Sequence, residues 1–189
     1  YFGATHPDSS APELAVDEVS WVWTGALGAD TVTVVAGVPG EARSASVELE
    51  SVGGGRTVRT DQVAISAERI ARVRVDGLEP DTHYDFTVIV DGSPDTERGV
   101  GSVRTPALGA MSFRVAVSAC ARIGSNGAVF DAIADSDPLL YLQLGDFHYG
   151  NLDGTDAAEF RAADERQLTQ PGQAALYRDV PIAYVWDDH

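Results

Sequence analysis

The chain has 189 residues, of which 44% are hydrophobic, so it is long enough for one large or two small domains with packed cores. Its formal net charge of −16 would repel polyanions, which predicts no nucleic-acid-binding surface. It has no 18-residue apolar run and no signal-peptide pattern at its start, so we expect no transmembrane segment and a chain that is either cytoplasmic or already processed.

Strand patterns separated by turn signals fill residues 13–106, after a short lead over residues 1–12. Apolar residues alternate with polar ones around Val73 and Val75, for example, and Asp76-Gly77 supplies the positive φ that a tight turn needs. The regular spacing of such signals predicts a β-sandwich.

The stretch LEPDTHYDF, residues 78–86, resembles the tyrosine corner of fibronectin type III and immunoglobulin-like modules. In such a corner the phenol, here Tyr84, bonds back to the chain a few residues upstream. The resemblance implies an all-β fibronectin III/immunoglobulin-like fold and carries no activity. Trp21 and Trp23 lie two apart on one strand face, and we expect them in the sandwich core.

The pattern changes after a linker over residues 107–111, because residues 112–189 alternate between strand and helix signals. This β-α-β-α-β order implies a parallel or mixed sheet with helices on its faces. The second strand is apolar at nearly every position, as expected for a strand covered on both faces. Strands are expected over 113–120, 138–146 and 181–189, and helices over 125–137 and 156–170, the latter broken at Pro171-Gly172 and resumed through Leu176.

Each of these three strands finishes in residues that could bind a ligand, and binding sites in open α/β sheets form at the carboxyl ends of strands. The first ends at Cys120 with Arg122 nearby, the second at Asp146 with Tyr149, and the third in residues 187–189, Asp-Asp-His. Thiolate and phenolate donors favour ferric iron over zinc or magnesium, so these ends predict an iron site.

Each residue also has an ordinary structural interpretation. Cys120 alone is more often a buried small apolar residue, Asp146 a turn or cap residue, and Tyr149 a packed aromatic. The acidic residues 187–188 and His189 alone would be a solvated tail. Their joint position at successive strand ends favours the metal site.

Three motifs in this order, SxCAR (118–122), LGDFHY (144–149) and WDDH (186–189), resemble the metal-site motifs of PhoD-type alkaline phosphatases and phosphodiesterases. That family belongs to the metallophosphoesterase superfamily and is related to purple acid phosphatases. The resemblance implies that an immunoglobulin-like domain precedes the first part of an α/β metallophosphoesterase domain over 112–189, incomplete in this chain. It also implies a secreted or periplasmic protein in its mature form.

The resemblance also implies a ligand set for a dinuclear site. Cys120 and Tyr149 would be terminal ligands of Fe³⁺, and Asp146 would bridge the iron to a second divalent ion, often calcium. Asp188 would be a further ligand. The bound cations would activate a water for attack on phosphorus.

The catalytic residues implied by the resemblance are His189, which would contact the transferring phosphoryl group, and Arg122, which would orient phosphate. The resemblance assigns no role to His148. The implied activity is hydrolysis of phosphoric mono- or diesters, with small phosphate esters or phospholipids as substrates.

Two alternatives stay open: a phospholipase D-like lipid phosphodiesterase of the same family, and a non-catalytic fibronectin-like binding module. A dinucleotide-binding protein is disfavoured, because no G-x-G-x-x-G sequence follows a strand. Family members continue well beyond WDDH, so we expect the remainder of the catalytic domain, continuous or as a separate chain, to be a partner. By itself, the part over 112–189 would expose a sheet edge and an apolar sheet face.

Overall fold

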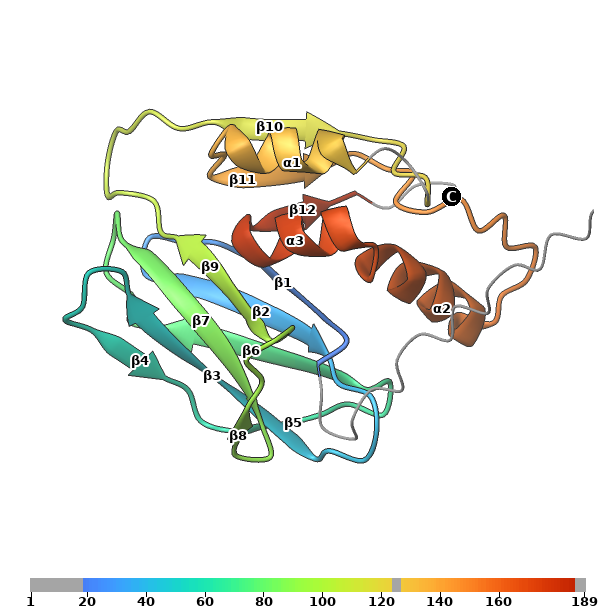
Figure 1. Ribbon diagram of the computed structural model, residues 1–189, viewed down its shortest axis with the longest axis horizontal. Coiled ribbons are helices and arrows are strands. Elements are labelled where there is room, and N and C mark those ends of the chain that lie inside the picture. Colours follow the sequence, from blue (N-terminus) through green and yellow to red (C-terminus); the bar gives the residue numbers. More distant parts are fainter. Residues whose placement is uncertain (1–18, 124–126, 186–189) are drawn as a thin grey trace, which may run out of the picture.

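The computed structural model describes residues 19–123 and 127–185, which form two regions (Figure 1). A β-sandwich comes first and an α/β region second. The sandwich strands are β1 (Trp21–Gly25), β2 (Thr31–Gly37), β3 (Ser44–Ser51), β4 (Thr57–Arg59), β5 (Val63–Ala64), β6 (Ile70–Asp76), β7 (His83–Val90), β8 (Ser93–Pro94) and β9 (Val100–Arg104).

The sandwich consists of two antiparallel sheets. One has the order β1-β2-β6, and the other has β4-β3-β7-β8, with β5 also paired to β3 and β9 to β7. Alternate residues of β6 and β7 are buried between the sheets, Val73 and Val75 from one and Tyr84 and Phe86 from the other. This confirms the period-two pattern and places the core between the sheets.

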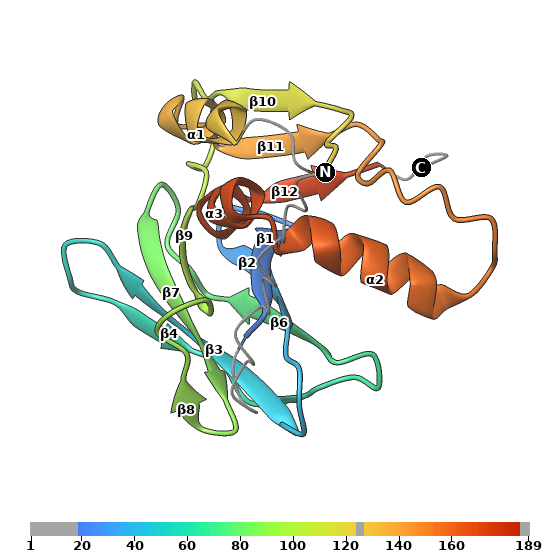
Figure 2. The same ribbon diagram turned by 45° about the vertical axis from the view of Figure 1, so that its right-hand side comes forward.

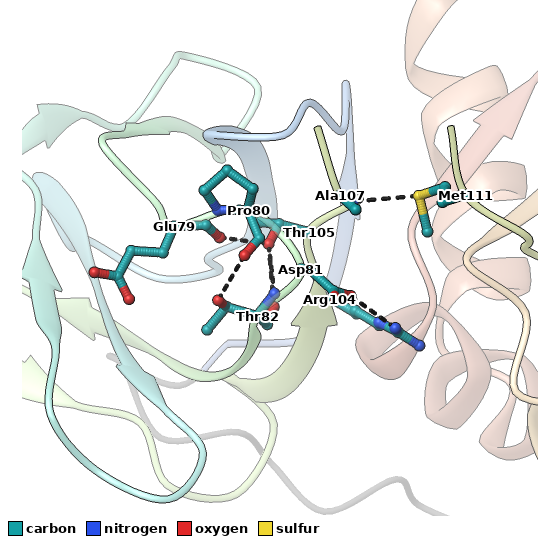
Figure 3. A network of polar contacts seen from close by, with 8 residues as sticks. All are labelled: Glu79, Pro80, Asp81, Thr82, Arg104, Thr105, Ala107 and Met111. Atoms are coloured by element: carbon teal, nitrogen blue, oxygen red, sulfur yellow. Dashed lines mark hydrogen bonds and ion pairs between the residues drawn. The ribbon is translucent and has the colours of Figure 1, made fainter. Parts of the chain in front are cut away.

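The predicted tyrosine corner is confirmed. The backbone N–H of Glu79 donates to Tyr84 Oη at 2.8 Å, five residues upstream of the phenol. Figure 3 shows the adjoining network, in which Thr105 Oγ1 donates to the Glu79 carbonyl at 2.6 Å and accepts from the Thr82 N–H at 3.0 Å. These bonds fix the end of β9, where the chain leaves the sandwich for the α/β region.

The α/β region contains a parallel sheet of order β10-β11-β12. The predicted order of strands and helices is therefore confirmed. The helix that resumes after Gln170 is separate and runs past Leu176 to Asp179, because Pro171 begins a new first turn, where proline is well tolerated. The elements are β10 (Val115–Ser118), α1 (Ala128–Asp135), β11 (Leu140–Gln143), α2 (Ala157–Leu168), α3 (Pro171–Asp179) and β12 (Ile182–Tyr184).

The two faces of the parallel sheet differ. On one face Tyr141 and Ile182 are buried against α1 and α3, and the Tyr141 ring stacks on Tyr177 of α3 with centroids 6.0 Å apart. On the other face Val117 is 54% exposed and Leu144 is 49% exposed. The expectation that the second strand is covered on both faces is therefore wrong for this chain, whereas the expected exposure of an apolar sheet face is confirmed.

The expectation that Trp21 and Trp23 lie in the sandwich core is also wrong. They lie on the outer face of β1, where Trp21 is buried in a cluster with Phe147 and Leu168 of the α/β region, and Trp23 packs against that cluster. In Figures 1 and 2, α3 runs beside this side of the sandwich, and it contacts both β1 and β9. The tryptophans thus join the two regions. Within the described ranges, no helix is long and apolar enough to span a membrane.

Candidate metal centre

The ends of β10 and β11 lie at the same edge of the sheet, because the two strands are parallel and in register. Backbone hydrogen bonds continue past the strands: the Leu144 N–H donates to the Ser118 carbonyl at 2.8 Å, and the Cys120 N–H donates to the Gly145 carbonyl at 3.2 Å. The loop after β10 is therefore fixed beside the loop after β11.

Both loops turn sharply at the candidate ligands. Gly145 has a φ of 108°, Asp146 a φ of 48° and Cys120 a φ of 64°. Side chains disfavour this left-handed region, at a cost of about 1 kcal/mol or more each. The fully buried Gln143 supports the turn, because its Nε2 donates to the Gly145 carbonyl at 2.9 Å.

The three candidate ligands described by the structure meet at one oxygen. Asp146 Oδ2 accepts a hydrogen bond from Tyr149 Oη at 2.6 Å and one from Cys120 Sγ at 3.2 Å. Asp146 and Tyr149 are half-buried and Cys120 is exposed. Cys120 and Tyr149, together with Arg122 and Asn151, line a pocket of about 430 Å³.

The electrostatics keep the phenol protonated in the absence of a cation. The pKa of Tyr149 is raised above its ordinary value. The largest cause is its hydrogen bond to the Asp146 carboxylate, and the next is its hydrogen bond with Cys120. A cation bound by these groups would have to displace the phenol and thiol protons, so its binding would be coupled to proton release.

The structure thus brings together Cys120, Asp146 and Tyr149 and places Arg122 on the same pocket. Asp188 and His189 lie outside the described residues. Among the residues that are described, no group of three or more histidines, cysteines, aspartates or glutamates could hold a metal ion. The candidate centre contains one cysteine, Cys120, and one aspartate, Asp146, and its third donor is the phenol of Tyr149.

Sequence reasoning missed two residues of this neighbourhood. Asn151 lines the pocket and has a φ of 46°, a conformation in which asparagine is enriched. Its position after Gly150, two residues beyond Tyr149, is the sequence feature that could have indicated this role. His148 is 6% exposed, and its Nδ1 accepts from the Gly150 N–H at 3.2 Å. Its burial beside candidate ligands has no signal in a single sequence.

The fold and the site together define a two-region chain, a β-sandwich followed by a parallel α/β sheet whose strand ends carry a thiol, a carboxylate and a phenol. Comparison with solved structures shows the same fold in a structure of PhoD, with a TM-score of 0.79 and 19% identity over 95% of this chain. The match covers 40% of the PhoD chain, so this chain spans less than half of that protein.

Other similar structures cover about half of this chain. One is a sensor domain of the anti-sigma factor RsgI4 of Pseudobacteroides cellulosolvens, with 14% identity over 51% of this chain and 100% of that chain and a TM-score of 0.41. Another is the FN5 domain of Drosophila Lar, with 18% identity over 49% of this chain and 99% of that chain and a TM-score of 0.39. No protein-family model and no curated protein matches the chain.

Proposed function

We propose that this chain is part of a metal-dependent phosphoric ester hydrolase of the PhoD type. The observation that carries the proposal is the convergence of Cys120 and Tyr149 on Asp146 Oδ2. A thiol and a phenol that both donate to one carboxylate oxygen, from loops held by backbone bonds, lie where a single cation could replace their protons. The shared fold of the PhoD structure supports the same conclusion.

The donor set fits the metals that the sequence resemblance implies. Cys120 and Tyr149 would hold Fe³⁺, and Asp146 would use its two oxygens to bridge to a second divalent ion, with calcium as the candidate. Asp188 is proposed as a further ligand. Two such cations supply a water of lowered pKa and neutralise the charge that develops on a phosphoryl group.

The remaining residues would bind and orient the substrate. Arg122 lines the same pocket as Cys120 and Tyr149, which supports the proposal that its guanidinium would pair with phosphoryl oxygens. His189 is proposed to donate a proton to the phosphoryl group or the leaving oxygen. Arg122 and the cations also let a chain of net charge −16 accept an anionic substrate.

We also propose a secreted or periplasmic location and further polypeptide of the catalytic domain as a partner. That polypeptide, continuous or separate, would cover the open sheet face around Val117 and Leu144, where apolar side chains contact water. The substrate is proposed to be a small phosphate ester, and a phospholipid is the alternative that a phospholipase D-like enzyme would use.

The test combines metal analysis with hydrolysis assays. We expect iron by plasma mass spectrometry, a visible charge-transfer absorption from the Tyr149 phenolate, and turnover of p-nitrophenyl phosphate or its bis ester. Phosphatidylcholine vesicles provide the lipid arm. Tyr149→Phe should abolish the absorption, and Asp146→Asn should remove both iron and turnover, because it changes the carboxylate that accepts from both Cys120 and Tyr149.

Asp153→Asn is the matched control, since Asp153 is an exposed aspartate of the same connecting segment. It should leave iron content and turnover unchanged. Colourless, iron-free protein that still hydrolyses these esters would exclude the iron assignment. Protein that binds no metal and tolerates both Cys120→Ser and Asp146→Asn would instead favour the non-catalytic binding module.

A further inference from the structure

A second pocket, of about 240 Å³, adjoins the candidate metal centre. Arg122 and Tyr149 line both pockets, so the two are neighbours with one arginine between them. The volume is below the roughly 300 Å³ at which pockets for drug-sized ligands begin, so it suits a single small group. The lining residues are Arg122, Ile123, His148, Tyr149, Gly150, Ala163 and Arg166.

The pocket is cationic in a strongly acidic protein. The chain has 29 acidic residues and 13 arginines, yet the described lining contains two arginines and no carboxylate. Arg122 comes from the loop after β10 and Arg166 from the last turn of α2. Because the two belong to separate elements, only the tertiary fold brings both guanidiniums to one pocket.

The side of the pocket formed by His148, Gly150 and Ala163 is closely packed. His148 is buried, and its Nδ1 accepts from the Gly150 N–H. A Cβ added at Gly150 would lie 3.3 Å from His148 Nδ1 and 3.4 Å from Ala163 Cβ, so the loop and α2 leave no slack there. The pocket is therefore bounded by a fixed wall.

The charges of α2 are divided between its faces. Arg166 and Ala163 line this pocket, whereas Arg161, Asp164 and Glu165 line a different pocket, of about 400 Å³, between the sandwich and the α/β region. Asp164 also lies 3.8 Å from His148 Nε2, on the far side of that ring from the Gly150 contact. Of the charged α2 side chains that line these two pockets, Arg166 lies at the second pocket, and both carboxylates lie at the other one.

We propose that this second pocket binds a phosphate group of the substrate other than the one that reacts. The inference rests on the proposed function: the reacting phosphate lies in the pocket of Cys120 and Tyr149, and Arg122 stands between the two groups. Two guanidiniums match the charge of a phosphate dianion and can each form paired hydrogen bonds with it. The preferred substrates are thus bisphosphates with a short spacer.

The first experiment compares propane-1,3-diol bisphosphate with propyl phosphate in phosphate-release assays of the metal-loaded protein. Arg166→Gln should lower kcat/KM for the bisphosphate about tenfold and change it less than twofold for propyl phosphate. Arg161→Gln is the control, because it removes an equal charge from the same helix but faces the other pocket; it should change neither value. Equal losses on both substrates, or equal effects of the two variants, would overturn the proposal.

The second experiment does not depend on turnover. Inorganic phosphate is titrated by ³¹P nuclear magnetic resonance into protein treated with a chelator, and Arg166→Gln should weaken binding at least about fivefold relative to wild type and Arg161→Gln. That loss, together with no hydrolytic activity of the metal-loaded protein, would overturn the proposed function and leave the phosphate pocket standing. Hydrolysis with no effect of Arg166→Gln in either experiment would do the reverse.

Discussion

The two regions of the molecule bury their apolar residues in different ways. In the sandwich, both sheets turn an apolar face inward, and Val47, Leu49 and Tyr84 have no exposed surface. In the α/β region, the sheet is covered on one face only, and Val117 and Leu144 are about half exposed on the other. The sandwich thus completes a core of its own, whereas the sheet that carries the candidate site relies on α1, α3 and the outer face of the sandwich.

A matched pair of leucines gives the largest expected difference. Leu49→Ala should lower the free energy of unfolding by about 2–5 kcal/mol, because it leaves a cavity in a closed core. Leu144→Ala, at a half-exposed position, should cost less than about 1 kcal/mol. Urea denaturation followed by circular dichroism measures both, and similar costs would mean that the open face is covered in solution.

The contact between the two regions can be weakened at one glycine. A Cβ at Gly101 of β9 would lie 2.3 Å from the Arg178 carbonyl of α3 and 2.7 Å from Cζ of Phe86, so Gly101→Ala must push the helix away, must also displace the Phe86 ring, and should cost about 1–3 kcal/mol. Gly127→Ala is the control, since among the described residues, its chain neighbours aside, no atom lies within 4 Å of its Cβ position. Calorimetry of Gly101→Ala should show the α/β transition moving below that of the sandwich, and a single unshifted transition would contradict this coupling.

Replacing a tyrosine with phenylalanine should have different consequences for stability and for metal binding in the two regions. Tyr84→Phe removes the acceptor of the Glu79 N–H and should cost about 1 kcal/mol of stability without affecting metal content. Tyr149→Phe should remove the proposed iron absorption as well as the hydrogen bond from Tyr149 Oη to Asp146 Oδ2, so the loss of absorption, rather than the change in stability, distinguishes it from Tyr84→Phe. Thermal unfolding and visible absorption of the two variants separate a structural phenol from a functional one.

The sequence predicts the sandwich and the strand order well, because alternation and turn residues are local signals. Tyr84 and its corner follow from a nine-residue stretch, and the convergence of Cys120 with Asp146 follows from parallel strand topology. The position of Trp21 could not be predicted, because a period of two says which residues share a face but not which face is inside. Arg166 could not be placed near Arg122, since that proximity depends on how α2 packs.

Two aspartates should give the two regions opposite responses to acid. Burial acts to raise the pKa of Asp95 in the sandwich, but backbone N–H groups, including those of Gly99 and Val19, donate to its carboxylate and hold its pKa below the ordinary value. In the α/β region, burial raises the pKa of Asp164, assisted by the charge of Glu165 and opposed by His148.

A lowered pKa stabilises the fold above the ordinary value of about 3.9, and that stability is lost as the pH falls through the folded-state pKa. A raised pKa does the opposite, since its stability is present at low pH and lost as the pH rises through the folded-state value. Asp95→Asn should therefore lower stability at neutral pH and reduce the loss of stability that occurs between about pH 5 and pH 3. Asp164→Asn should raise stability at neutral pH. Each change should be less than about 1 kcal/mol after solvent screening. Urea midpoints of the two variants, measured at several pH values, test both expectations. If both substitutions shifted the midpoint at neutral pH in the same direction, the carboxylates of the two regions would not differ in the way that their burial and hydrogen bonds imply.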